Sequence, residues 1–279
     1  MASNLIAILT DFGDSDPYVG IMKGVISRIA PDLNLIDLNN HIPPGDIQQG
    51  AFHLWQAAAY FPSDAVFLAV VDPGVGTSRQ GLYLQRGDQV FIGPDNGLFS
   101  YLGYKSPTTA WELANPDFQL RNPSSTFHGR DIFAPAAAYA TMGIRGEQFG
   151  EIVGSLNQLP PPLCQVNKDH LRGEVISIDR FGNLITSLGQ FQKTEKTLEI
   201  NSWIEDLIIG FPPNPEIHHD QAAESLPLVS TFSDIPPGSC AGLIGSCGLL
   251  EIVANQSSAA ALLKASIGDV ITLTWNYPG

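Results

Sequence analysis

Short apolar runs alternate with stretches of helical period in the first half of the chain. The run 65–71 is apolar on both faces, which is typical of a buried parallel strand. In the segment 46–61, Asp46 and Gln49 have the spacing of a helix capping box. Because strands and helices alternate, the pattern predicts an α/β sheet. The predicted strands are 5–10, 33–38 and 65–71, the predicted helices are 18–30, 46–61 and 129–142, and 81–93 is a predicted hairpin.

The pattern changes after residue 150. The sequence Leu159-Pro160-Pro161-Pro162 is typical of a stiff extended spacer. Beyond it, short runs of β type are separated by turn signals, which predicts a small β-barrel or sandwich. We therefore expect an N-terminal α/β domain over 1–158, a linker over 159–171 and a C-terminal β domain over 172–279. The predicted strands of the second domain are 173–179, 184–187, 197–200, 241–244, 249–253 and 269–275.

Composition narrows the class of ligand. The 279 residues are 44% hydrophobic, which supports a full core, and only 15% are charged. The formal net charge of -14 would repel phosphate backbones. This argues against nucleic acid as a partner and favours a cationic small molecule.

Cysteine usage and the amino terminus bear on location and metal binding. Three cysteines without a CxxC pair indicate neither a disulfide framework nor a cysteine zinc site. The six histidines lack an HExxH spacing, so we expect no metal site. The chain enters its first predicted strand without a basic or cleavable apolar segment, and no apolar run reaches the roughly 18 to 20 residues of a membrane span. These features predict a cytoplasmic protein with no membrane partner.

A carboxylate at the end of a buried strand is the first candidate for chemistry. Asp72 follows the run 65–71, and a loop with two glycines then leads to Arg79. Ligands of α/β proteins bind at the carboxyl ends of strands, and glycine permits close backbone approach. The loop lacks the third glycine of a dinucleotide fingerprint and the Lys-Ser/Thr pair of a phosphate-binding loop. His128, in a polar cluster before a predicted helix, adds a group that titrates near neutral pH, although a structural histidine fits the same pattern.

Other candidates have an equally ordinary structural interpretation. Asp11 follows the first strand and can accept hydrogen bonds from a ribose diol, or it can form an Asx turn or helix cap. Asp16 can cap the following helix or face an ammonium group. Asn183 and Phe181 can bind and stack on a purine, or they can form a plain hairpin turn. The small residues of 245–248 permit either a ligand or a turn.

Taken in order, the motifs resemble one family over almost the whole chain, the S-adenosyl-L-methionine (SAM) hydroxide adenosyltransferases. These are adenosine-forming SAM hydrolases related to the fluorinases and chlorinases. The motifs that carry the resemblance are Thr10-Asp11-Phe12-Gly13, Tyr18-Val19-Gly20, Val71-Asp72-Pro73-Gly74-Val75-Gly76, Gly93-Pro94-Asp95-Asn96-Gly97, Thr126-Phe127-His128-Gly129-Arg130-Asp131, Asp179-Arg180-Phe181-Gly182-Asn183 and the segment 246–255.

The resemblance implies a Rossmann-like α/β domain followed by a β-barrel domain. It also implies a homotrimer with active sites between the first domain of one subunit and the second domain of its neighbour. The implied reaction converts SAM and water to adenosine and L-methionine, with no metal or organic cofactor.

The implied site residues fall on the motifs. The catalytic group is Asp72, Arg79 and His128. The implied substrate contacts are Asp11 to the ribose hydroxyls, and Asp179 with its possible helper Asp16 to the methionine ammonium. Asn183, Glu251 and the Val253 backbone would bind the adenine edge. Ser246 would bind the methionine carboxylate or nearby polar atoms, and Phe181 and Phe232 would lie beside the rings.

Two other function classes stay open at this point. A SAM-dependent halogenase of the same fold differs in the nucleophile, and halogenases place a small hydroxyl residue where this chain has Gly129. A non-catalytic protein that binds SAM or adenosine would use Asp72, Arg79 and His128 as a structural network. A SAM methyltransferase is less favoured because a methyl acceptor needs a separate pocket.

Overall fold

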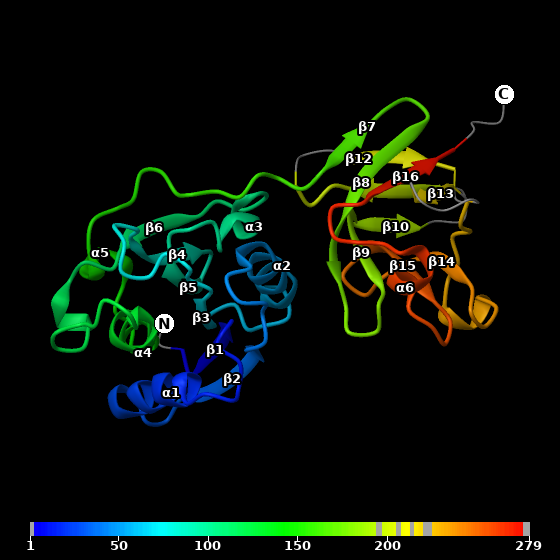
Figure 1. Cartoon of the computed structure of the whole chain (residues 1–279). Coiled ribbons are helices and arrows are strands. Elements are labelled where there is room, and N and C mark those ends of the chain that lie inside the picture. The colour runs from blue at the N-terminus through cyan, green and yellow to red at the C-terminus, as the bar shows by residue number, and fades with distance from the viewer. Residues whose placement is uncertain (1–2, 194–196, 205–207, 213–214, 220–224, 276–279) are drawn as a thin grey trace. The chain divides into compact units, whose positions relative to one another are not determined.

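The computed structural model divides into two compact units, an N-terminal unit (Met1–Leu159) and a C-terminal unit (Pro160–Gly279) (Figure 1). The residues described are 3–193, 197–204, 208–212, 215–219 and 225–275. The N-terminal unit is an α/β domain and the C-terminal unit is a barrel-like antiparallel sheet, which confirms the predicted fold class. None of the helices in the described ranges combines the length and apolar character that a membrane crossing needs.

The N-terminal unit has a six-stranded sheet of order β2-β1-β3-β5-β4-β6. The strands β1, β2, β3 and β5 are parallel, while β4 is antiparallel to both of its neighbours. The elements of this unit are β1 (Leu5–Thr10), α1 (Tyr18–Ile29), β2 (Asn34–Asn39), α2 (Ile47–Ala58), β3 (Val66–Val70), β4 (Gly81–Arg86), β5 (Gln89–Pro94), α3 (Ser100–Gly103), β6 (Thr109–Glu112), the 3-10 turn η1 (Pro116–Phe118), the π-helical turn η2 (Gly129–Phe133), α4 (Ala134–Thr141) and α5 (Gly146–Phe149).

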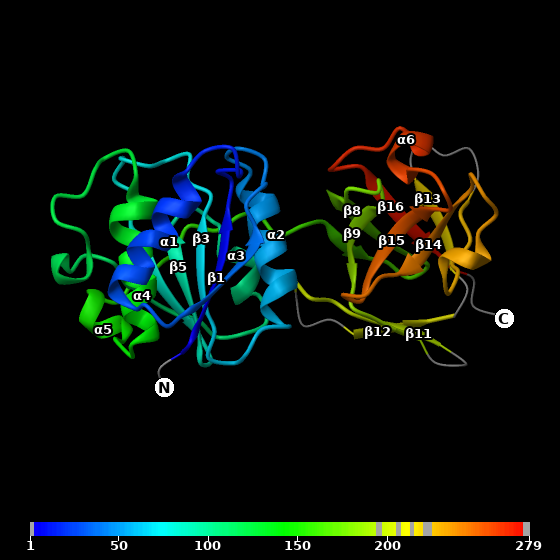
Figure 2. The same cartoon turned by 90° about the horizontal axis from the view of Figure 1, so that it is seen from below.

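Helices cover both faces of this sheet (Figure 2). Strand β3 shows why, because all of its side chains are buried. Val66, Leu68 and Val70 pack on the face covered by α1 and α4, while Phe67 and Ala69 pack on the face covered by α2 and α3. A strand buried on both faces needs apolar residues at every position, which is the pattern in 65–71.

Most of the predicted elements of this unit are present within two residues of their expected ends. Asp46 is the N-cap of α2, and its Oδ1 accepts from the Gln49 N–H at 3.0 Å. The capping interpretation of Asp16 is wrong, because α1 has Pro17 as its N-cap. The sequence pattern does not predict β6, which extends the sheet beyond β4.

In the C-terminal unit, six strands follow the order β13-β16-β8-β9-β15-β14, and β7 also pairs with β8. Segment 226–228 joins the two outer strands, because Leu226 bridges to Ile217 of β13 and Leu228 to Gly242 of β14. The sheet is thereby nearly closed into a barrel. The elements of this unit are β7 (Cys164–Val166), β8 (His170–Ile178), β9 (Leu184–Gly189), β10 (Phe191–Lys193), β11 (Leu198–Asn201), β12 (Ile208–Phe211), β13 (Glu216–His219), the 3-10 turn η3 (Phe232–Asp234), β14 (Cys240–Ile244), β15 (Leu249–Ala254), α6 (Ala259–Leu263) and β16 (Val270–Thr274), of which β10, β11 and β12 form a separate three-stranded sheet.

Candidate active site

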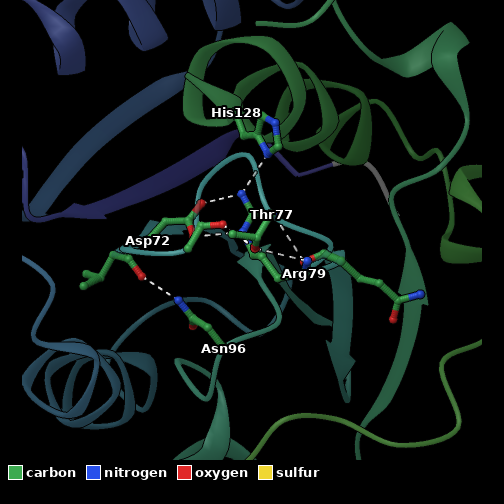
Figure 3. A network of polar contacts seen from close by, with 8 residues as sticks. Asp72, Thr77, Arg79, Asn96 and His128 are labelled. Carbon is green, nitrogen blue, oxygen red and sulfur yellow. Dashed lines mark hydrogen bonds and ion pairs between the residues drawn. The ribbon is translucent and has the colours of Figure 1, made fainter. Parts of the chain in front are cut away.

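Three segments of the N-terminal unit bring Asp72, Arg79 and His128 together (Figure 3). Asp72 follows β3, Arg79 lies just before β4, and His128 precedes η2. The side chains of Asp72 and Arg79 are only 5% and 9% exposed. The predicted cluster therefore exists as a contact network, with the side chains of Asp72 and Arg79 buried and His128 half-buried, at the carboxyl end of the parallel sheet, where this class of fold places its ligands.

Arg79 is the centre of the network. Its Nε donates to Asp72 Oδ1 at 2.8 Å, and its Nη2 donates to Asp72 Oδ2. The same Nη2 lies 2.8 Å from His128 Nδ1. The guanidinium carbon is 5.2 Å from the centroid of the Phe133 ring. A planar guanidinium makes such a two-point contact with a carboxylate and stacks on an aromatic ring, which a lysine cannot do in the same way.

The protonation state of His128 follows from these contacts. Burial and the adjacent charge of Arg79 hold the pKa of His128 below its ordinary value of 6.5, against the opposing charges of Asp72 and Asp131. The ring is therefore neutral at pH 7. Because a guanidinium only donates hydrogen bonds, Nδ1 must accept, and the ring proton is on Nε2. His128 thus presents a hydrogen-bond donor at Nε2.

A tight loop fixes the segment between Asp72 and Arg79. Thr77 Oγ1 donates to the Gly74 carbonyl at 2.7 Å and accepts from the Arg79 N–H at 3.4 Å. Gly76 has φ +80°, and a Cβ built there would lie 2.5 Å from the Ser125 carbonyl oxygen. Glycine is therefore needed for the close approach of this loop to the segment that leads into His128.

Asp11 and Asp16 differ in their surroundings. Asp11 follows β1, next to β3 in the sheet, and its Oδ2 accepts from the Gly45 N–H at 2.8 Å. This contact connects two loops at the same sheet edge. Asp16 is exposed before α1, and no hydrogen bond joins it to Asp72, Arg79 or His128 in the described structure.

Aromatic side chains, two of them adjacent in sequence to Asp11 and His128, line a pocket that the sequence pattern does not predict. Phe12, Tyr18 and Phe127 have ring centroids 5.3 to 6.0 Å apart. They line a pocket of about 350 Å³ together with Ser124, Thr126 and Arg130. Phe12 adjoins Asp11 and Phe127 adjoins His128 in sequence, so adjacency to predicted site residues was the available signal.

In the C-terminal unit, Asp179 and Asn183 form the turn between β8 and β9. Asp179 Oδ1 accepts from the backbone N–H groups of Phe181 at 2.8 Å and Asn183 at 2.9 Å. Its Oδ2 accepts from Asn183 Nδ2 at 2.9 Å. The hairpin interpretation is therefore confirmed. The proposed contacts of these side chains to a ligand stay predictions.

Phe181 and Phe232 belong to one pocket. The two residues are 70% and 45% exposed, and with Asn183 they contribute to a pocket of about 360 Å³. The pocket is also lined by Ala254, Gln256 and Ser257. Two exposed aromatic rings beside a buried amide are suited to a flat heterocycle.

The remaining predicted residues lie on or beside β15. Burial, followed by the nearby charge of Asp179, raises the pKa of Glu251. Ser246 is exposed in the turn between β14 and β15. Val253 is fully buried and pairs with Ala241 of β14.

The predicted residues thus form one group in each unit. Asp72, Arg79 and His128 are in direct contact, and Asp11 lies at the same sheet edge. In the C-terminal unit, Asp179 and Asn183 are in contact, and Asn183 shares a pocket with both phenylalanines. Among the residues that the structure describes, no cluster of His, Cys, Asp or Glu has the arrangement to hold a metal ion.

Comparison with known families gives two matches that together span most of the chain. Residues 6–150 match the model of the SAM hydroxide adenosyltransferase N-terminal domain. Residues 173–272 match the model of the C-terminal domain of the same family.

Curated relatives are similar over nearly the full length. A protein of Salinispora arenicola named (R)-S-adenosyl-L-methionine hydrolase is 37% identical, covering 96% of this chain and 97% of its own. A protein of the same name from Thermus thermophilus is 36% identical, covering 96% and 98%. A fluorinase from Actinopolyspora mzabensis is more distant, at 26% identity and 97% coverage of both chains.

A solved structure has the same fold. The crystal structure of an uncharacterised conserved protein from Thermotoga maritima superimposes with a TM-score of 0.86 at 32% identity, covering 97% of this chain and 100% of the other.

Proposed function

Because the chain belongs to the SAM hydroxide adenosyltransferase family, we propose that it hydrolyses SAM to adenosine and L-methionine. The observation that carries the proposal is the similarity over nearly the whole chain to proteins named (R)-S-adenosyl-L-methionine hydrolase. The contact network of Asp72, Arg79 and His128 supports it, because hydrolysis requires polar groups that position a water molecule.

In the proposed reaction, a water oxygen attacks C5′ in line with the bond from C5′ to sulfur. That bond breaks, and its electron pair goes to sulfur, which becomes the neutral thioether of methionine. The sulfonium already carries positive charge, so the leaving group needs no protonation. Catalysis therefore depends on positioning the water and removing one of its protons, and positioned proton transfer typically contributes about 10² to 10⁴-fold.

We assign the three side chains distinct roles. Neutral His128 accepts from Arg79 at Nδ1 and carries its proton on Nε2, so it fixes the guanidinium rather than acting as the base. Asp72 accepts the water proton, because a carboxylate oxygen retains acceptor capacity beside the single hydrogen bond that Arg79 gives it. Arg79 fixes both partners through one guanidinium. The released proton then passes to solvent.

Substrate recognition is proposed to use both groups of residues. Asp11, in the N-terminal unit, binds the ribose hydroxyls, and Asp16 helps with the methionine ammonium. In the C-terminal unit, the adenine lies between exposed aromatic rings, and an amide and a carboxyl group form hydrogen bonds to its edge. The residues assigned there are Phe181 and Phe232 to the rings, Asn183, Glu251 and the Val253 backbone to the adenine edge, Asp179 to the methionine ammonium and Ser246 to the methionine carboxylate.

We further propose a cytoplasmic homotrimer that works without metal or organic cofactor. Each site would combine the N-terminal unit of one subunit with the C-terminal unit of its neighbour. Subunit mixing tests this arrangement: Arg79→Met and Asn183→Ala proteins, each inactive alone, should regain activity when dissociated and reassembled together. Two inactive proteins that stay inactive after verified mixing would contradict shared sites.

The decisive experiment for the reaction uses purified protein and SAM in ¹⁸O-water, with adenosine followed by mass spectrometry. The expected result is label in the 5′-hydroxyl together with release of L-methionine. Both sulfonium epimers should be supplied, since the relatives' names specify the (R) form. Unlabelled adenosine would contradict attack at C5′. Formation of 5′-halo-5′-deoxyadenosine with halide present would instead indicate a halogenase, and tight adenosine binding without methionine release would indicate a binding protein.

A further inference from the structure

The motif Gly93-Pro94-Asp95-Asn96-Gly97 has no role in the chemistry described above, yet it contacts the catalytic loop. It lies at the carboxyl end of β5, next to β3 in the sheet. Asn96 Nδ2 donates to the carbonyl of Val71 at 2.8 Å (Figure 3). Its Oδ1 accepts from the Leu98 N–H at 3.2 Å, which orients the amide. Asn96 therefore holds the peptide group that immediately precedes Asp72.

The same motif also holds the other end of the loop. The Asp95 N–H donates to the Gln80 carbonyl at 2.9 Å, directly after Arg79. Arg79 Nη1 lies 3.4 Å from that same carbonyl oxygen. The backbone on either side of 72–79 is thus attached to two consecutive residues of one motif. The separation of the two ends sets where the carboxylate meets the guanidinium.

The motif is anchored in turn by the last residues of the N-terminal unit. The Asp95 side chain accepts from the Asn157 N–H at Oδ1 and from Asn157 Nδ2 at Oδ2, both at 2.9 Å. Gly97 has φ +99°, and a Cβ there would lie 3.0 Å from Leu159 Cγ. Asp95 is only 6% exposed, so its carboxylate cannot exchange these hydrogen bonds for bonds to solvent water. This contact is therefore a rigid anchor for the motif.

We propose that Asn96 is a positioning residue for the reaction, holding Asp72 in register with Arg79 and His128 through the Val71 carbonyl. Asn96 touches none of the three side chains and acts through the backbone. The proposal rests on the proposed function. Misplacement of a reacting group by about 1 Å can cost about 10²-fold in rate, so loss of this bond should lower kcat more than it raises KM.

The test compares Asn96→Ala with a matched control, Asn115→Ala. Asn115 makes the same pair of bonds away from the site, donating from Nδ2 to the Gln148 carbonyl at 2.8 Å and accepting at Oδ1 from the Asp117 N–H at 3.0 Å. We expect Asn96→Ala to lower kcat by roughly 10 to 10²-fold with KM within about threefold. The control should keep wild-type kcat despite a similar loss in thermal stability. Equal kcat values for the two variants would overturn the proposal.

Asn96→Asp gives an independent readout should the alanine variant fail to fold. The introduced carboxyl keeps the acceptor for Leu98 but places a second oxygen against the Val71 carbonyl. Its protonated form can donate again, so the ratio of variant to wild-type kcat should rise as the pH falls. A ratio that is flat with pH would contradict the proposed bond.

A measurement without substrate separates this proposal from the proposed function. Histidine NMR of wild type should show the Nε2-protonated tautomer of His128. In Asn96→Ala, displacement of the Asp72 carboxylate should lower the pKa of His128 further, because the Asp72 charge raises that pKa, while Asn115→Ala should leave it unchanged. An unchanged His128 titration overturns the positioning role even when hydrolysis is confirmed. A shifted titration with no SAM hydrolysis by wild type would instead overturn the proposed function alone.

Discussion

Removing the guanidinium of Arg79 gives the sharpest test of the network. In Arg79→Met, the Asp72 carboxylate keeps its burial but loses both hydrogen bonds from Arg79. The Asp72 side chain is only 5% exposed, so water cannot replace them without rearrangement. Breaking a buried ion pair by removing one partner costs about 3 to 5 kcal/mol, and we expect this loss in the N-terminal unit. Turnover should fall by at least about 10²-fold because both Asp72 and His128 lose their common partner.

The stability assay should report on the N-terminal unit alone. Native-state hydrogen exchange of β3 and β5 amides in urea gives a free energy of opening for that sheet. A double variant, Asp72→Asn/Arg79→Met, removes the unpaired charge and should regain most of the stability while staying inactive. A single variant that loses under about 1 kcal/mol, or a double variant as unstable as the single, would refute the buried-charge argument.

The same variant makes a prediction about pH. In wild type, burial and then Arg79 lower the pKa of His128, so its folded-state value lies below the ordinary 6.5. The associated stability is present above pH 6.5 and is lost as the pH falls through the folded value. Without Arg79, the opposing charges of Asp72 and Asp131 remain, so the pKa of His128 should rise. An NMR titration of His128 that is identical in wild type and Arg79→Met would contradict the electrostatic role of Arg79.

Three further predictions concern other parts of the site. A Cβ at Gly129 would lie 3.3 Å from Met22 Sδ and Phe127 Cε2, so Gly129→Ser should destabilise the protein by about 1 kcal/mol. The variant should yield no chlorinated product when it is incubated with SAM and chloride. Detection of 5′-chloro-5′-deoxyadenosine by mass spectrometry would contradict this expectation. Burial and the Asp179 charge raise the pKa of Glu251 above 4.5, so the folded protein loses stability as the pH rises through the raised value. Glu251→Gln should therefore raise the free energy of unfolding at pH 7 and have little effect at pH 4, as measured by urea unfolding at both pH values. A larger gain in stability at pH 4 than at pH 7 would refute this. Dialysis against EDTA should leave the rate of adenosine release unchanged, whereas a loss restored by a divalent metal would show a metal requirement.

Asp72 could be predicted from the sequence because the features that mark it as a candidate lie next to it along the chain. The apolar run before Asp72 predicts a buried parallel strand, and the carboxyl end of such a strand is a known location for chemistry. Arg79 follows on the same loop. The contact between His128 and Arg79 joins residues far apart in the sequence, although Arg130 is closer to His128 along the chain. In the structure, Arg130 pairs with Asp131 at 2.6 Å and leaves the Arg79 guanidinium to contact His128.

Features that depend on contacts between distant segments could not be predicted from the pattern of apolar and polar residues. Closure of the barrel uses 226–228, which has no strand-like alternation and pairs through isolated bridges. Asn96 has its partner 25 residues earlier, at the Val71 carbonyl. An asparagine in a Pro- and Gly-rich segment predicts only a turn from its neighbours. Its contact with the catalytic loop depends on the parallel pairing of β3 and β5, which brings the ends of both strands to one edge.

The distribution of fixed contacts matches what displacement at a sulfonium requires. The leaving group departs as a neutral thioether, so an acid to protonate it would add nothing to the rate. The poorly nucleophilic water is the component that must be positioned, and preorganised polar groups do this without reorganising during the reaction. The loop from Asp72 to Arg79 is held at both ends by Asp95 and Asn96, and in its middle by Thr77. A loop held at three points restricts the Asp72 carboxylate in the same way before and after substrate arrives, so the rate should respond to the rigidity of this loop more than to any further charge placed beside it.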